Sequence, residues 1–144
     1  DMGLDPKSII FEITESLLMS NQESNRQRMH ALRAAGCGIA IDDFGTGYSA
    51  LSYLRSFPID MVKIDRTFVR SIPGEKQECL LLDGIINLVN NLGMTLIIEG
   101  VETDDQLDYL KQRQCSYIQG FLFSKPLPFD DLLSYLQRVM PSRM

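Results

Sequence analysis

The chain has 144 residues, of which 44% are hydrophobic and 23% charged, a balance typical of one globular domain with its own core. Its formal net charge of -5 argues against a basic surface for a nucleic-acid polymer. No apolar run approaches the roughly 18 residues that a membrane segment needs.

Apolar runs and amphipathic stretches alternate along the first part of the chain. Residues 9–13 follow a proline-marked turn and are predicted to form a strand. A helix is predicted for residues 25–35, ended by Gly36, and a second strand for residues 38–41. A glycine-punctuated loop follows this second strand.

The middle of the chain continues the alternation. Residues 51–57 present Leu51, Leu54 and Phe57 on one helical face, and Pro58 stops that helix. A strand at 61–65 and a strongly apolar helix at 79–92 follow. A fourth strand is predicted for residues 95–99.

The last part of the chain completes the same pattern. Thr103 and Gln106 form a capping box that predicts the start of a helix. Residues 117–123 are predicted to be a fifth strand. A final amphipathic helix is predicted for residues 129–139, with three leucines facing inward: Leu132, Leu133 and Leu136.

Strands that alternate with helices predict an α/β fold with a parallel sheet covered by helices. Two architectures fit this pattern, a doubly wound open sheet and a (β/α)8 TIM-type barrel. A whole barrel typically needs about 250 residues. The chain would therefore correspond to the C-terminal five or so βα units of a barrel.

Cysteine and histidine usage narrows the chemistry. Cys37, Cys79 and Cys115 are far apart and odd in number, which argues against a disulfide framework or a zinc site and favours the reducing cytoplasm. We expect them to be small buried apolar residues. The single histidine, His30, lies in a polar-rich helix and is expected at the surface, which excludes a histidine-based triad.

Polar residues recur near the carboxyl end of every predicted strand, where βα folds bind ligands. In chain order they are Glu12 with Glu15, Asp42 with Asp43, Lys63 with Asp65, Glu99 with Glu102, and Gln119. Taken singly, each has a structural explanation: a strand-end charge, a turn-capping acid or a lysine that extends its ammonium to water. Four acids gathered on one rim would repel each other unless divalent metals and one lysine neutralised them.

The chemistry of such a rim follows from its ligands. Carboxylate oxygens select magnesium or manganese over zinc or copper. Two adjacent ions sharing a carboxylate suit the in-line attack of water on a phosphodiester. Lys63 would orient the water or neutralise phosphate charge.

Five segments stand in a characteristic order and spacing: FEITE at 11–15, DDFGTGYS at 42–49, KID at 63–65, EGVET at 99–103 and QGF at 119–121. Together with SKPLP at 124–128 they resemble the EAL-domain phosphodiesterases of bacteria. This resemblance covers essentially the whole chain. It implies hydrolysis of cyclic di-GMP to linear pGpG by two Mg²⁺ or Mn²⁺ ions in a (β/α)8 barrel.

The resemblance also implies roles for individual residues. Glu12, Asp42, Asp43 and Glu99 would be metal ligands, with Asp42 as the bridge. Glu99 would also be a general base, and Lys63 would hold the catalytic water. Further substrate-contacting or supporting residues would be Glu15, Asp65, Glu102, Gln119, Thr46, Gly47, Tyr48 and Ser49, with Glu15 anchoring the loop from Phe44 to Ser49.

The Glu-Ala-Leu signature and the asparagine of the following strand are absent from residues 1–144. We therefore expect this chain to be the C-terminal portion of an EAL domain in the cytoplasm. Upstream segments of a longer parent protein could tether it to a membrane. Unpaired sheet edges predict a homodimer or other self-association. The main alternative is a non-catalytic domain that binds cyclic di-GMP or a protein partner. A receiver-like domain and an enolase-type lyase barrel fit the order of the acids and lysine less well.

Overall fold

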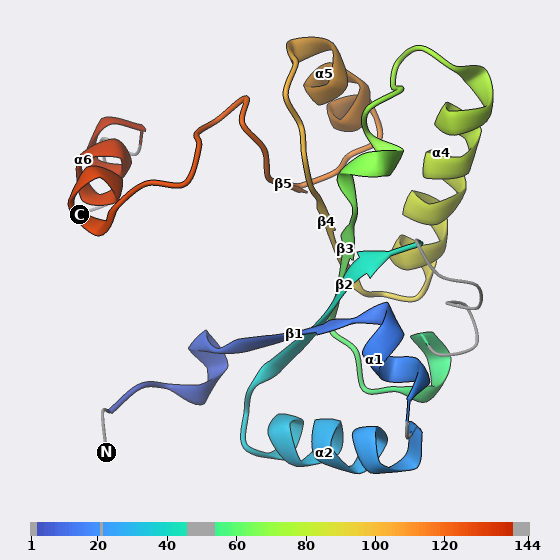
Figure 1. Ribbon diagram of the computed structural model, residues 1–144, viewed down its shortest axis with the longest axis vertical. Coiled ribbons are helices and arrows are strands. Elements are labelled where there is room, and N and C mark those ends of the chain that lie inside the picture. Colours follow the sequence, from blue (N-terminus) through green and yellow to red (C-terminus); the bar gives the residue numbers. More distant parts are fainter. Residues whose placement is uncertain (1–2, 21, 46–53, 140–144) are drawn as a thin grey trace.

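The computed structural model describes residues 3–20, 22–45 and 54–139, and a five-stranded sheet forms its centre. The strands are β1 (Ile10–Thr14), β2 (Gly38–Phe44), β3 (Met61–Ile64), β4 (Thr95–Ile98) and β5 (Tyr117–Ile118). All neighbouring pairs are parallel and the strands lie side by side in chain order (Figure 1). A doubly wound sheet would reverse its strand order at a switch point, so this order favours consecutive units of a (β/α)8 barrel.

Helices follow the strands, as the sequence predicts. They are α1 (Glu15–Met19), α2 (Gln22–Ala34), α4 (Lys76–Asn91), α5 (Asp104–Gln112) and α6 (Phe129–Val139). Two 3-10 turns, η1 (Pro6–Ser8) and η2 (Arg66–Phe68), and the short helix α1 were not predicted. Residues 54–56 are helical, but the remainder of the predicted helix 51–57 falls mostly outside the described residues.

The core lies between the sheet and the helices that follow its strands. Strands β2, β3 and β4 contribute side chains that are 0–1% exposed and pack with equally buried side chains of α2, α4 and α5. The strand members include Ile39, Ile41, Val62, Ile64 and Ile98, and the helix members Met29, Leu82, Val89 and Leu110. Because side chains alternate along a strand, the residues between these core positions face the other side of the sheet.

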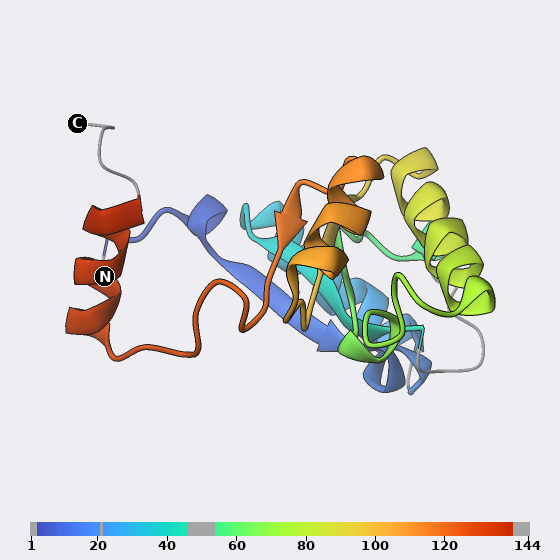
Figure 2. The same cartoon turned by 90° about the horizontal axis from the view of Figure 1, so that it is seen from above.

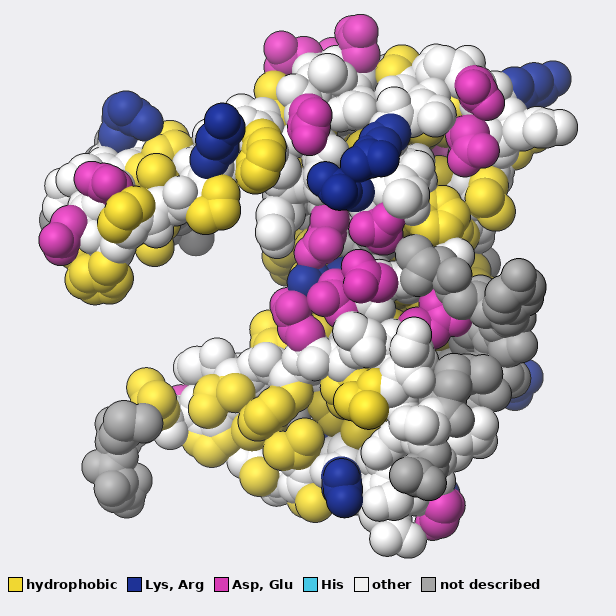
Figure 3. Space-filling model, in the orientation of Figure 1, with side chains coloured by type: hydrophobic (Ala, Val, Ile, Leu, Met, Phe, Trp, Pro, Cys, Tyr) yellow, Lys and Arg dark blue, Asp and Glu magenta, His cyan; other side chains and the backbone are white. Residues whose placement is uncertain are grey.

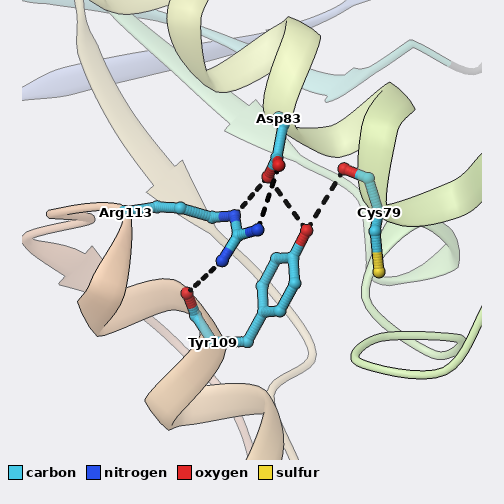
Figure 4. A network of polar contacts seen from close by, with 4 residues as sticks. All are labelled: Cys79, Asp83, Tyr109 and Arg113. Atoms are coloured by element: carbon cyan, nitrogen blue, oxygen red, sulfur yellow. Dashed lines mark hydrogen bonds and ion pairs between the residues drawn. The ribbon is translucent and has the colours of Figure 1, made fainter. Parts of the chain in front are cut away.

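A polar network joins α4 to α5 (Figure 4). The guanidinium of Arg113 donates to both carboxylate oxygens of Asp83, and the Tyr109 hydroxyl donates to Asp83 Oδ1 at 2.9 Å. Tyr109 also contacts the carbonyl of Cys79 at 3.2 Å, and Arg113 lies over the Tyr109 ring. These contacts clamp two helices together on the side of the sheet that holds the core.

Helix α6 does not pack on the sheet, and the prediction that its leucines face inward is wrong. Leu132, Leu133 and Leu136 are 39%, 44% and 40% exposed. Figures 1 and 2 show α6 set apart from the other helices at the end of an extended segment. Its amphipathic pattern is real, but among the described residues no side chain of α6 joins the core.

The predicted strand 117–123 is correct only for its first two residues. Beyond β5 the chain turns, and the Phe123 amide bonds to the Gly120 carbonyl at 3.1 Å. Val101 causes this change, because its amide donates to Gln119 and its carbonyl accepts from Leu122 at 3.1 Å. A Cβ atom on Gly120 would overlap the Val101 backbone, so only glycine permits this close approach.

The remaining expectations concern single residues. Cys37, Cys79 and Cys115 are free thiols that are half-buried rather than fully buried, and His30 is exposed as predicted. Of the helices that the structure describes, none combines the length and apolar character needed to cross a bilayer.

Candidate functional site

Lys63 lies at the centre of a cluster of carboxylates. Its side chain is 9% exposed, and its Nζ atom lies 2.8 Å from Glu12 Oε2, 3.2 Å from Asp42 Oδ1 and 2.8 Å from Glu99 Oε1. The four residues come from β1, β2, β3 and the residue after β4. Four segments far apart in sequence therefore deliver one ammonium and three carboxylates to a single point.

Strand register explains why these side chains meet. Val62 and Ile64 face the core with no exposure, so Lys63 between them must face the opposite side of the sheet. Ile41 likewise faces the core and Asp42 does not. Figure 3 shows acidic side chains gathered around basic ones over this part of the sheet.

The charges of the cluster do not balance. Burial alone would lower the pKa of Lys63, but hydrogen bonds to Glu12, Glu99 and Asp42 outweigh burial and hold that pKa above its usual value. The lysine is therefore a fixed cation. Three carboxylates around one ammonium leave two more negative than positive charges at the site.

Asp43 stands apart from the Lys63 contacts. Its φ of 54° is unusual for a residue other than glycine, and the pairing of β2 with β3 shifts register between Ile41 and Phe44. Its amide donates to Asp42 Oδ1 at 3.1 Å, and its side chain is exposed. Regular alternation would turn Asp43 toward the core, as it does Ile41, and would turn Phe44 away from it. The register shift instead leaves Asp43 exposed and returns Phe44 to the core.

Glu15 contacts the start of the loop after the acidic pair. It is only 5% exposed, and its Oε2 accepts a hydrogen bond from the Gly45 amide at 3.2 Å. Glu15 thus contacts the second residue of the loop from Phe44 to Ser49, and its anchoring role stays a prediction. The predicted loop residues Thr46, Gly47, Tyr48 and Ser49 lie outside the described residues.

Lys63 pairs with Glu12, Asp42 and Glu99, whereas Asp65, Glu102 and Gln119 lie in other surroundings. Asp65 caps η2 by accepting from the Thr67 amide at 2.9 Å. Burial would raise the pKa of Asp65, but its hydrogen bonds to Thr67 and the Arg66 amide hold that pKa below the usual value. Glu102 and Gln119 are exposed, and the Glu102 amide donates to Gln106 Oε1.

A cavity of about 530 Å³ adjoins the cluster on the β4–β5 side. Glu99, Glu102 and Gln119 line it, as do three residues that sequence reasoning did not assign to the site: Arg66, Lys125 and Tyr135. Two of these had a signal in the sequence, since Arg66 follows the KID segment directly and Lys125 lies in the SKPLP segment.

The carboxylates of the site fit a divalent metal by ligand type, although they are arranged around Lys63. In the part of the chain that the structure describes, no three acidic, histidine or cysteine side chains are arranged as a metal-binding group, because the carboxylates are drawn onto Lys63. The ligand type fits a hard cation, since the candidate donors are all carboxylate oxygens. The two surplus negative charges fit a divalent ion in the same way.

Comparisons with known proteins assign the chain to one family. A model of the EAL domain matches residues 1–126. The cyclic di-GMP phosphodiesterase RocR of Pseudomonas aeruginosa is 42% identical over 135 residues, which are 94% of this chain and 34% of RocR. The chain thus spans about a third of that relative's length.

Solved structures give the same result. The EAL domain of Mycobacterium smegmatis DcpA is 39% identical with a TM-score of 0.88, over 94% of this chain and 61% of that one. Klebsiella pneumoniae BlrP1, in a complex with manganese and cyclic di-GMP, is 38% identical with a TM-score of 0.81, over 86% of this chain and 32% of that one. At 38–39% sequence identity, the similarity between this chain and these two structures indicates a shared family as well as a shared fold.

Proposed function

Because this chain belongs to the EAL domain family, we propose that the protein containing it hydrolyses a phosphodiester bond of cyclic di-GMP to give linear pGpG. The observation that carries the proposal is the convergence of Glu12, Asp42 and Glu99 on Lys63 at the carboxyl ends of parallel strands. RocR, named as a cyclic di-GMP phosphodiesterase, and BlrP1, solved with cyclic di-GMP, support the choice of substrate.

The proposed cofactors are two divalent cations, Mg²⁺ or Mn²⁺. Glu12, Asp42, Asp43 and Glu99 would hold them. When bound, the ions supply Lewis acidity at the phosphate and lower the pKa of the attacking water. BlrP1 complexes with manganese and with calcium support a metal site in the family.

The chain's own residues would perform the remaining steps. Lys63, fixed as a cation, would hold the oxygen of the attacking water and offset negative charge on the phosphate. Glu99 would accept the proton that this water loses as its oxygen bonds to phosphorus and the opposite ester oxygen leaves. Gln119, Glu102, Asp65 and the loop residues Thr46, Gly47, Tyr48 and Ser49 are proposed as substrate-contacting or supporting residues.

The wider setting is also proposed. The chain covers only 61% of the DcpA EAL chain, which supports assigning it to part of an EAL domain. We propose that this part is the C-terminal portion. Three free thiols support a reducing, cytoplasmic location. Self-association of this portion is also proposed, because the described sheet is open at both edges.

The test measures cyclic di-GMP turnover by the intact protein with Mg²⁺, with Asp42→Asn as the variant and Asp108→Asn as the matched control. Loss of an outer-shell partner typically lowers activity about 10–100-fold, so loss of a proposed ligand should lower it further. Asp108 is exposed on α5 and should leave turnover unchanged. An intact protein that converts no cyclic di-GMP, or an Asp42→Asn variant at the wild-type rate, would refute the proposal.

A second candidate is a non-catalytic domain that binds cyclic di-GMP or a protein partner. The carboxylates of the described residues contact Lys63 and form no metal-binding group among themselves, which favours this alternative. Calorimetric titration of cyclic di-GMP with Ca²⁺ in place of Mg²⁺ separates the two. Binding without turnover in either metal would identify a sensor, whereas turnover restricted to Mg²⁺ or Mn²⁺ would identify an enzyme.

A further inference from the structure

The turn η2 follows the strand that carries Lys63 and lies against the loops after both neighbouring strands. On one side, the ring of Phe68 packs on Gly45, two residues beyond Asp43. A Cβ atom on Gly45 would lie only 2.6 Å from Phe68 Cζ. On the other side, a Cβ atom on Gly100, directly after Glu99, would overlap the Arg66 Cβ.

Both contacts are possible only because glycine occupies these positions. Gly45 has a φ of +94° and Gly100 a φ of +74°, in the region that other residues rarely adopt. Each loop therefore approaches η2 as closely as a backbone without a side chain allows. Asp42 and Asp43 lie in β2 just before the first of these loops, and Glu99 directly precedes Gly100 in the second.

The turn η2 is itself held firmly. Asp65 Oδ1 accepts from the Thr67 amide at 2.9 Å and caps the turn. After the turn, the carbonyl of the fully buried Val69 accepts from the side-chain amide of Gln106 at 3.1 Å. Gln106 belongs to the capping box of α5, so the turn is tied to a helix of the core.

We propose that Phe68 is a positioning residue for the acidic pair. Gly45 is held from one side by the Glu15 carboxylate and from the other by the Phe68 ring. Fixing Gly45 in this way restricts where the preceding Asp42 and Asp43 lie relative to Lys63. The catalytic consequence rests on the proposed function, whereas the contact and its effect on metal binding do not.

The experiment compares Phe68→Ala, Phe68→Leu and a control in the intact protein. The control is Leu82→Ala, which removes a fully buried side chain of α4. Each variant is measured for kcat and KM with cyclic di-GMP, for Mn²⁺ affinity by calorimetry, and for melting temperature. Phe68→Ala should lower kcat and Mn²⁺ affinity about 10-fold each, and Phe68→Leu should recover part of both. Leu82→Ala should lower only the melting temperature.

A double-variant cycle tests the contact itself. Gly45→Ala introduces a Cβ atom that meets the Phe68 ring, so its effect on Mn²⁺ affinity should be smaller in the Phe68→Ala background. An equal effect in both backgrounds, or a Phe68→Ala variant that matches Leu82→Ala in kcat and Mn²⁺ affinity, would overturn the inference. A wild-type protein that binds Mn²⁺ without turnover would refute the proposed function while the affinity measurements still decide the role of Phe68. A wild-type protein that binds no Mn²⁺ would overturn both.

Discussion

At the scale of single residues, the charge balance of the site depends on Lys63. Replacing it by methionine in Lys63→Met leaves Glu12, Asp42 and Glu99 facing each other without their common cation. We expect the free energy of unfolding to fall by about 1–3 kcal/mol, less than for a fully buried ion pair because Glu12 is half exposed. Added Mn²⁺ should restore much of this loss, because a divalent ion would supply the missing positive charge.

Urea unfolding with and without Mn²⁺ measures this effect. The matched control is Lys111→Met, since Lys111 is 62% exposed and its ion pair with Asp108 is a surface pair worth little. Turnover should fall in Lys63→Met and stay unchanged in the control. Equal stability and turnover of Lys63→Met and wild type would remove Lys63 from the mechanism.

Several of these residues could be placed from the sequence because strands have a fixed period. Glu12, Asp42 and Lys63 lie within two residues of the carboxyl ends of their strands. Glu99 directly follows β4, and parallel pairing brings these positions to one edge of the sheet. The exposure of Asp43 could not be predicted, because regular alternation would turn it toward the core and the register shift in β2 prevents this. Phe68 was missed because its contact with Gly45 is long-range and leaves no local pattern.

At the scale of secondary-structure elements, the clamp between α4 and α5 predicts a pH dependence. The Arg113 guanidinium, opposed by partial burial and assisted by the Tyr109 hydroxyl, holds the pKa of Asp83 below its ordinary value of 3.8. A carboxyl with a lowered pKa in the folded state stabilises the fold above its unfolded pKa. That stabilisation is lost as the pH falls through the folded pKa. Asp83→Asn should therefore lose stability at neutral pH and show a shallower decline of stability below about pH 4.

The measurement is the free energy of unfolding between neutral and strongly acidic pH, for wild type and Asp83→Asn. Asp108→Asn serves as the control, because Asp108 is exposed on the same helix as Arg113. The difference between wild type and Asp83→Asn should shrink at acid pH, whereas the control should follow wild type throughout. A constant difference across the pH range would mean that ionised Asp83 contributes nothing to the clamp.

Elements marked by a local sequence signal were predicted correctly, whereas elements whose extent or packing depends on contacts distant in sequence were not. The capping box of Thr103 and Gln106 is present as predicted, because both partners lie within one helical turn. The strand expected at 117–123 ends at Ile118. Beyond it, the Gln119 carbonyl and the Leu122 amide bond to the backbone of Val101, in the loop after β4. The apolar pattern of 129–139 predicted a helix correctly but could not show whether any surface covers it.

At the scale of the whole molecule, the alternation of strands and helices predicts the order of the strands in the sheet. It does not predict whether the sheet closes into a barrel. Among the described residues, β1 pairs only with β2, and β5 pairs only with β4, so the sheet is open at both edges. Near β1, Ile9, Ile10 and Phe11 are 37–46% exposed. A sheet of this kind carries unpaired backbone groups beside apolar side chains, which is the usual setting for association between chains.

We therefore expect residues 1–144 alone to self-associate. Helix α6 adds to the tendency, because Phe129, Leu133 and Val139 are 72%, 44% and 50% exposed and lie apart from the sheet. Sedimentation velocity over a range of micromolar concentrations should show dimers or larger species, and Leu133→Glu should shift the distribution toward the monomer by placing a charge on that face. Lys111→Met, on the surface of α5, should leave it unchanged. A single species of 16.3 kDa at all concentrations would contradict the expectation, because open edges and a bare apolar helix would then be stable in water without a partner.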